Sequence, residues 1–86
     1  MKLKDGFFMR QVAGQTVVLP GGDVLDLNMM ITLNETGAFL GERLNEETSV
    51  EALVAALLGE YDVDEKTAQQ AVEAFVRKLY DYGFLD

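Results

Sequence analysis

The sequence predicts an α+β fold in which a small antiparallel sheet precedes three helices. Short runs rich in β-branched and aromatic residues fill the first third of the chain, and glycine-containing turns separate them. From residue 34 onward, apolar residues recur at the three- and four-residue spacing of helices. With 86 residues, of which 49% are hydrophobic and 26% charged, the chain has enough apolar material for one small core. We therefore expect a single domain over residues 1–86.

Three strands are expected at the front of the chain. The first covers residues 7–12 and the second residues 15–19, and the short spacing around Gly14 predicts an antiparallel hairpin. Residues 20–23, Pro-Gly-Gly-Asp, form a turn sequence. The third strand is expected over residues 24–33, where one face carries Leu25, Leu27, Met29, Ile31 and Leu33. Because only helices follow it, this strand should lie at a sheet edge, whose unpaired backbone groups can accept another chain.

The first helix is expected over residues 35–44. Asn34 is a suitable N-cap because its side chain can accept a hydrogen bond from the first turn. Gly37 and Gly41 each weaken the helix by roughly 1 kcal/mol relative to alanine. We therefore interpret both glycines as sites of close packing.

Two further helices complete the predicted fold, which resembles a winged helix-turn-helix with its sheet first. Thr48 and Glu51 fit a capping box at the start of the second helix. Asp64 is expected to cap the third helix, and Gly83 suits the position just after its end, so that residues 84–85 can fold back onto the core. The apolar positions with helical spacing are Val50, Leu53, Val54, Leu57, Leu58 and Tyr61, followed by Ala68, Ala71, Val72, Phe75, Val76 and Leu79.

The residue types available for catalysis are few. The chain contains neither cysteine nor histidine, which removes disulfides, thiolate metal sites and the commonest general base. The acidic pairs at residues 46–47 and 62–64 lie in expected capping turns, where solvated carboxylates are normal. We expect no enzyme activity, no cofactor and no metal. The N-terminus does not resemble a signal peptide and no apolar run is long enough to span a membrane, so a cytoplasmic protein is expected.

Charge is distributed unevenly along the chain. The formal charge is −8, with −1 in residues 1–44 and −7 in residues 45–86. Such a surface repels a phosphate backbone, and the charges of residues 65–82 sum to zero, so no nucleic-acid partner is expected. Peptide or protein binding is the function that remains. Winged-helix DNA binding and dimerisation through the same sheet edge stay open as alternatives.

Several short segments together resemble the PqqD family, the standalone form of the RiPP recognition element. The similarity extends from about Gly14 to Leu85, and the order and spacing of its segments are more specific than any one of them. These segments are residues 17–19, 25–28, 33–38 (Leu-Asn-Glu-Thr-Gly-Ala) and 48–53, then Tyr61, Val72, Phe75 and Leu79, and finally residues 83–85.

This resemblance implies a non-catalytic chaperone for a ribosomally synthesised precursor peptide. The leader segment would be held as an added strand and presented to a modifying enzyme, which in the pyrroloquinoline quinone pathway is a radical SAM protein. The strand edge implied by the resemblance comprises Leu25, Asp26, Leu27, Asn28, Met29 and Met30. The helix wall beside it comprises Ala71, Ala74, Phe75 and Lys78.

Overall fold

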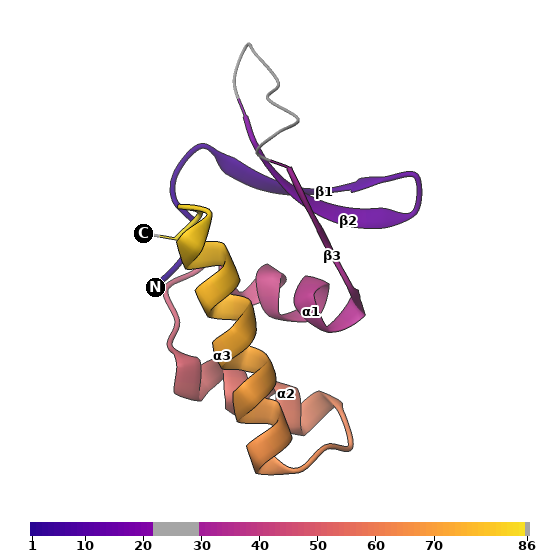
Figure 1. Cartoon of the computed structure of the whole chain (residues 1–86), viewed down its shortest axis with the longest axis vertical. Coiled ribbons are helices and arrows are strands. Elements are labelled where there is room, and N and C mark those ends of the chain that lie inside the picture. Colours follow the sequence, from indigo (N-terminus) through magenta and orange to yellow (C-terminus); the bar gives the residue numbers. More distant parts are fainter. Residues whose placement is uncertain (22–29, 86) are drawn as a thin grey trace.

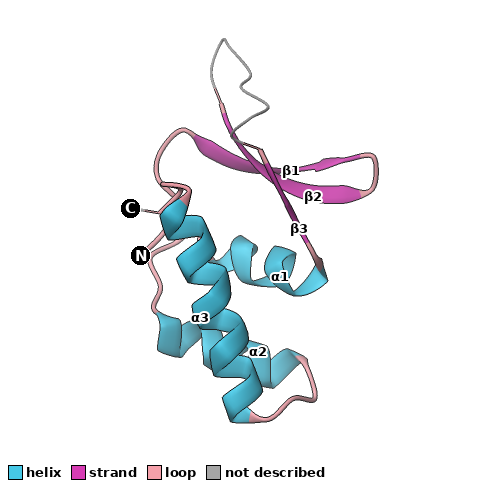
Figure 2. Cartoon of the chain, in the orientation of Figure 1, coloured by secondary structure: helices cyan, strands magenta, loops and turns pink. Residues whose placement is uncertain are grey.

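The computed structural model describes residues 1–21 and 30–85, and it confirms the α+β fold (Figure 1). A three-stranded antiparallel sheet is followed by three helices, as Figure 2 shows. The elements are β1 (Phe7–Val12), β2 (Gln15–Pro20), β3 (Ile31–Leu33), α1 (Glu35–Arg43), α2 (Val50–Glu60) and α3 (Glu65–Asp81). Residues 24–29 of the predicted third strand lie outside the described residues, and within the described part β3 is three residues long.

The sheet has the strand order β1-β2-β3, so β3 lies at an edge as predicted. The β1–β2 hairpin closes through two residues, Ala13 and Gly14, with φ values of 53° and 80°. Positive φ at both central positions is typical of the type I′ turn, whose twist matches that of the two strands. Gly14 therefore lies in the hairpin turn that the sequence predicted, and Ala13 is the other central residue of that turn.

One face of the sheet contributes to the core. Val18 pairs with Ile31 across β2 and β3, so their side chains share a face, and both are buried. The exposed Thr32 between the buried Ile31 and Leu33 confirms the predicted alternation over this part of the third strand. The largest fully buried side chains of the core are Phe84, Leu40, Leu44, Leu53, Leu79, Val18 and Val72.

The N-caps of α1 and α3 are those that the sequence predicted. Asn34 Oδ1 accepts a hydrogen bond from Gly37 N at 2.7 Å, and Asp64 Oδ1 accepts one from Thr67 N at 3.0 Å. An ideal Cβ on Gly41 would lie 2.8 Å from Met9 Sδ, so this glycine permits close packing between α1 and β1, as expected.

The predicted capping box of α2 is wrong by one residue. The N-cap is Ser49, whose Oγ accepts a hydrogen bond from Ala52 N at 3.1 Å. The backbone of Thr48 instead pairs with the chain start: its N–H donates to Met1 O at 2.9 Å, and its carbonyl accepts from the Met1 ammonium at 2.8 Å. This contact between distant parts of the chain fixes Thr48 outside the helix.

The two ends of the chain are joined beside the core. Gly83, with φ of 76°, follows the end of α3 as predicted, and it turns the buried Phe84 and Leu85 back onto the core. Leu3 forms a β-bridge with Leu85, and Lys4 N donates to Phe84 O at 2.9 Å. The Phe7 and Phe84 rings lie 4.7 Å apart between centroids. In the part of the chain described here, no helix has the length and apolar character required to cross a bilayer.

Candidate functional site

A groove of about 460 Å³ lies between the end of β3, the first turns of α1 and one face of α3. Its lining combines apolar side chains with hydroxyl and amide groups. The lining residues are Thr32, Leu33, Asn34, Thr36, Gly37, Leu40, Ala71, Ala74, Phe75 and Lys78.

The helix wall of the groove is one stripe of α3. Ala71, Ala74, Phe75 and Lys78 recur at intervals of three, one and three residues, which places them on the same helix face. The neighbouring stripe, which contains Val72 and Leu79, is buried in the core. The structure thus brings together all four helix residues that the family resemblance implied, while their contribution to binding stays a prediction.

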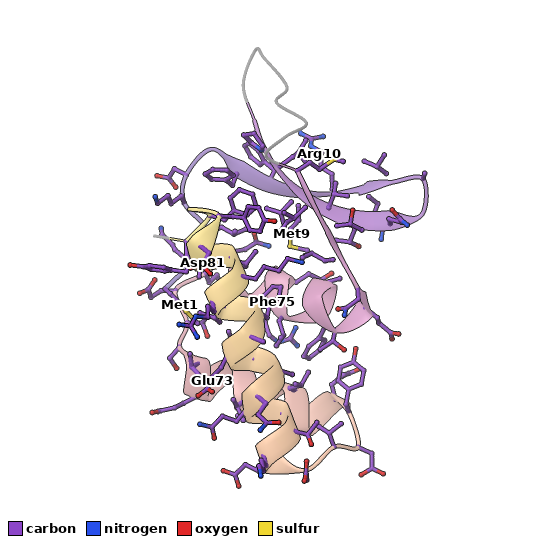
Figure 3. The ribbon with its side chains drawn as sticks, in the orientation of Figure 1. Met1, Met9, Arg10, Glu73, Phe75 and Asp81 are labelled. Atoms are coloured by element: carbon purple, nitrogen blue, oxygen red, sulfur yellow. The ribbon has the colours of Figure 1, made fainter. Side chains whose placement is uncertain are left out.

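Small residues keep the groove open. Ala71 and Ala74 have short side chains, so little side-chain volume projects from α3 into the groove beside Phe75. Figure 3 shows Phe75 on the side of α3 that faces α1. An ideal Cβ on Gly37 would lie 3.3 Å from Phe75 Cε1 and 3.2 Å from Asn34 Oδ1. The absence of a side chain at Gly37 therefore lets the aromatic ring pack against the capped first turn of α1.

The strand wall of the groove is the edge of the sheet. β2 pairs with β3 on one side through Val18↔Ile31 and Thr16↔Leu33, and among the described residues no strand pairs with its other side. In an antiparallel pair, alternate residues direct their backbone N–H and C=O groups away from the partner. These outward groups of β3 lie beside the groove and can accept an added strand.

The predicted edge residues are only partly covered by the structure. Met30 is half-buried and lies directly before β3. Leu25, Asp26, Leu27, Asn28 and Met29 lie outside the described residues. The backbone groups that the structure places at the edge belong to residues 31–33, at the carboxyl end of the predicted strand.

Lys78 is the one charged side chain among the described residues that line the groove, and it is exposed. Two groups outside this lining have pKa values shifted from their ordinary range. Partial burial, and then the charges of Glu35 and Glu60, raise the pKa of Tyr61. Hydrogen bonds from the side chain and backbone of Thr67 lower the pKa of Asp64. The lining contains no pair of acidic side chains, and in the described residues no cluster of three potential metal ligands occurs. The groove is suited to holding an extended, mainly apolar segment.

Sequence reasoning missed the lining residues that α1 contributes. Thr36, Gly37 and Leu40 line the groove, and a periodicity does not reveal which residues of α1 lie near α3. The strand-to-helix segment at residues 33–38 carries part of the family resemblance, and it is the available indication of their role.

Comparisons with known proteins give one matching family and two solved structures of the same fold. The model of the family described as coenzyme PQQ synthesis protein D (PqqD) matches residues 15–85. A solved structure of TbiB1 in complex with the TbiA(β) leader peptide is similar over 100% of this chain and 95% of that one, with 26% identity and a TM-score of 0.80. A lasso peptide synthetase B1 complexed with the leader peptide covers 96% of this chain and 93% of its own, with 25% identity and a TM-score of 0.75. No curated protein sequence matches the chain.

Proposed function

Because the chain belongs to the PqqD family, we propose that it captures the leader segment of a ribosomally synthesised precursor peptide and presents that peptide to a modifying enzyme. The observation that carries this proposal is the open edge of β3 beside the groove wall of α3. Both similar structures are complexes with leader peptides, which supports a peptide as the ligand.

The captured segment would bind as a fourth strand along β3. Its backbone would supply hydrogen bonds to the outward groups of residues 31–33, which requires no particular sequence. Alternate side chains of an added strand point to one face, so every second residue would enter the groove over Ala71 and Ala74. The exposed ammonium of Lys78 would favour an acidic side chain at its end of the groove.

Binding of this kind promotes a reaction by position alone. A peptide held on a protein that also contacts the enzyme has a raised effective concentration at the active site. We propose that the whole chain, residues 1–86, works in this way in the cytoplasm as one domain without catalysis of its own. The enzyme would be a radical SAM protein or another peptide-modifying enzyme.

Selection from a displayed library of random linear peptides tests this proposal. We expect the selected peptides to carry apolar residues at alternate positions. In calorimetry with a selected peptide, Ala71→Leu should weaken binding about tenfold because the added side chain fills the groove.

The matched control is Ala52→Leu, which adds the same atoms at an exposed position of α2 outside the groove. This variant should bind the selected peptide as the unmodified protein does. Equal affinity of the Ala71→Leu variant, or equal losses in both variants, would contradict capture in this groove.

A further inference from the structure

A second groove, of about 250 Å³, lies between α2 and the first turns of α3. Its base is apolar and is formed by Val50, Val54, Ala55 and Leu58 of α2. Among these residues Leu58 is a large aliphatic side chain with 37% of its surface exposed. The polar lining residues are Glu51, Glu65 and Gln69.

α2 contains more apolar residues than the core buries. The helix reads Val-Glu-Ala-Leu-Val-Ala-Ala-Leu-Leu-Gly-Glu, yet only Leu53 and Leu57 are buried. A helix that packs on one side normally carries polar residues on its other side. Here Val54 is half-buried against the core, and Leu58, one turn later, continues the apolar surface to the exposed side of the helix. Contiguous apolar surface of this kind marks sites of protein interaction, whereas single exposed apolar residues do not.

The charges around this groove are predominantly negative. Both of its charged lining residues, Glu51 and Glu65, are acidic. Residues 50–69 contain five carboxylates and one lysine, a net charge of −4. A partner that fits the groove must therefore place apolar side chains at its centre and basic side chains at its rim.

We propose that this groove docks a second protein through a basic surface with an apolar centre, such as one face of a Lys- and Arg-rich amphipathic helix. The occupant differs from the captured peptide, because an extended strand has no unpaired sheet edge to join at α2 and α3.

The two grooves can be occupied at the same time. At 100° per residue, Glu65 and Gln69 lie roughly 165° around α3 from the stripe of Ala71, Ala74 and Lys78. In Figure 1, the α2–α3 connection forms the end of the molecule opposite the sheet. The domain can therefore hold a peptide at β3 while a partner contacts α2, and this docking surface does not depend on the identity of the peptide.

The probe for this surface is a synthetic peptide of leucine and lysine, patterned so that its helix carries leucines on one face. In an NMR titration of the whole chain, we expect shift changes concentrated in α2 and the first turns of α3. Leu58→Ser should weaken binding about tenfold, and Val63→Ser, which alters an equally exposed residue outside the groove, should leave it nearly unchanged.

A charge-matched pair of variants separates docking from general attraction to an acidic protein. Glu51→Gln with Glu65→Gln should weaken binding more than Glu42→Gln with Glu46→Gln, although both pairs remove two charges at exposed positions. A peptide of leucine and glutamate should not bind. Shift changes spread over the whole surface, or equal losses in the two double variants, would overturn the proposal.

Discussion

At the scale of single residues, two glycines in helices have opposite surroundings. A Cβ on Gly37 would crowd Phe75 and Asn34, whereas a Cβ on Gly59 would meet nothing within 4 Å. We therefore expect Gly59→Ala to raise the free energy of unfolding by roughly 0.5–1 kcal/mol, the usual difference in helix propensity. Gly37→Ala should raise the free energy of unfolding by less than this. It should also weaken peptide binding because the Phe75 ring must move. Denaturant titration and calorimetry measure both effects, and equal gains in stability with unchanged affinity would contradict the packing role of Gly37.

The cap of α3 makes stability depend on pH. Because hydrogen bonds from Thr67 lower the pKa of Asp64 in the folded state, the unfolded state takes up a proton first as the pH falls. The stabilisation is therefore complete above the unfolded pKa of about 3.9 and is lost as the pH falls through the folded value. Asp64→Asn keeps an acceptor for Thr67 N and cannot titrate. We expect the variant to lose less stability below pH 4 than the unmodified protein in acid-denaturation curves; parallel curves would rule out this contribution.

At the scale of elements, the β1–β2 turn offers a direct test of its geometry. Ala13 has φ of 53°, a left-handed conformation that costs an L-residue roughly 1–2 kcal/mol. Ala13→Asn supplies the residue that type I′ turns prefer before glycine, so it should raise the melting temperature by about 4–8 °C for each kcal/mol gained. Gly14→Ala, at φ of 80°, should lower it. Thermal melts that move in the same direction for both variants would be incompatible with this turn.

The helices, strands and most helix caps were predictable from the sequence, whereas the contacts between distant parts of the chain were not. The caps at Asn34 and Asp64 were predictable because an acceptor side chain precedes each apolar helical pattern. Thr48 and Ser49 are both plausible caps, and a contact with Met1, far away along the chain, decides between them. In the same way, the family resemblance implied the four groove residues of α3, whereas helical spacing alone predicted a core face, and the contribution of Gly37 and Leu40 depends on how α1 is placed against α3.

At the scale of the whole molecule, the proposed function requires that the β3 edge be free in solution. If two copies paired through this edge, the peptide and the second copy would compete for the same backbone groups. The negative charge of −8 opposes self-association. We expect light scattering at two protein concentrations to give the mass of one chain in both. A dimer that a selected peptide dissociates would support the alternative of edge pairing, in which capture must displace a partner.

The central claim is that a peptide adds to the edge of β3. Amide hydrogen exchange with and without a selected peptide tests it most directly, because an added strand must accept hydrogen bonds from the outward N–H groups of residues 31–33. We predict that bound peptide slows exchange at the outward amides of β3, and that Ala52 and Ala55 of α2, which lie outside the groove beside β3, serve as unchanged references. Unchanged exchange along β3 under saturating peptide, with new protection elsewhere, would contradict capture by strand addition.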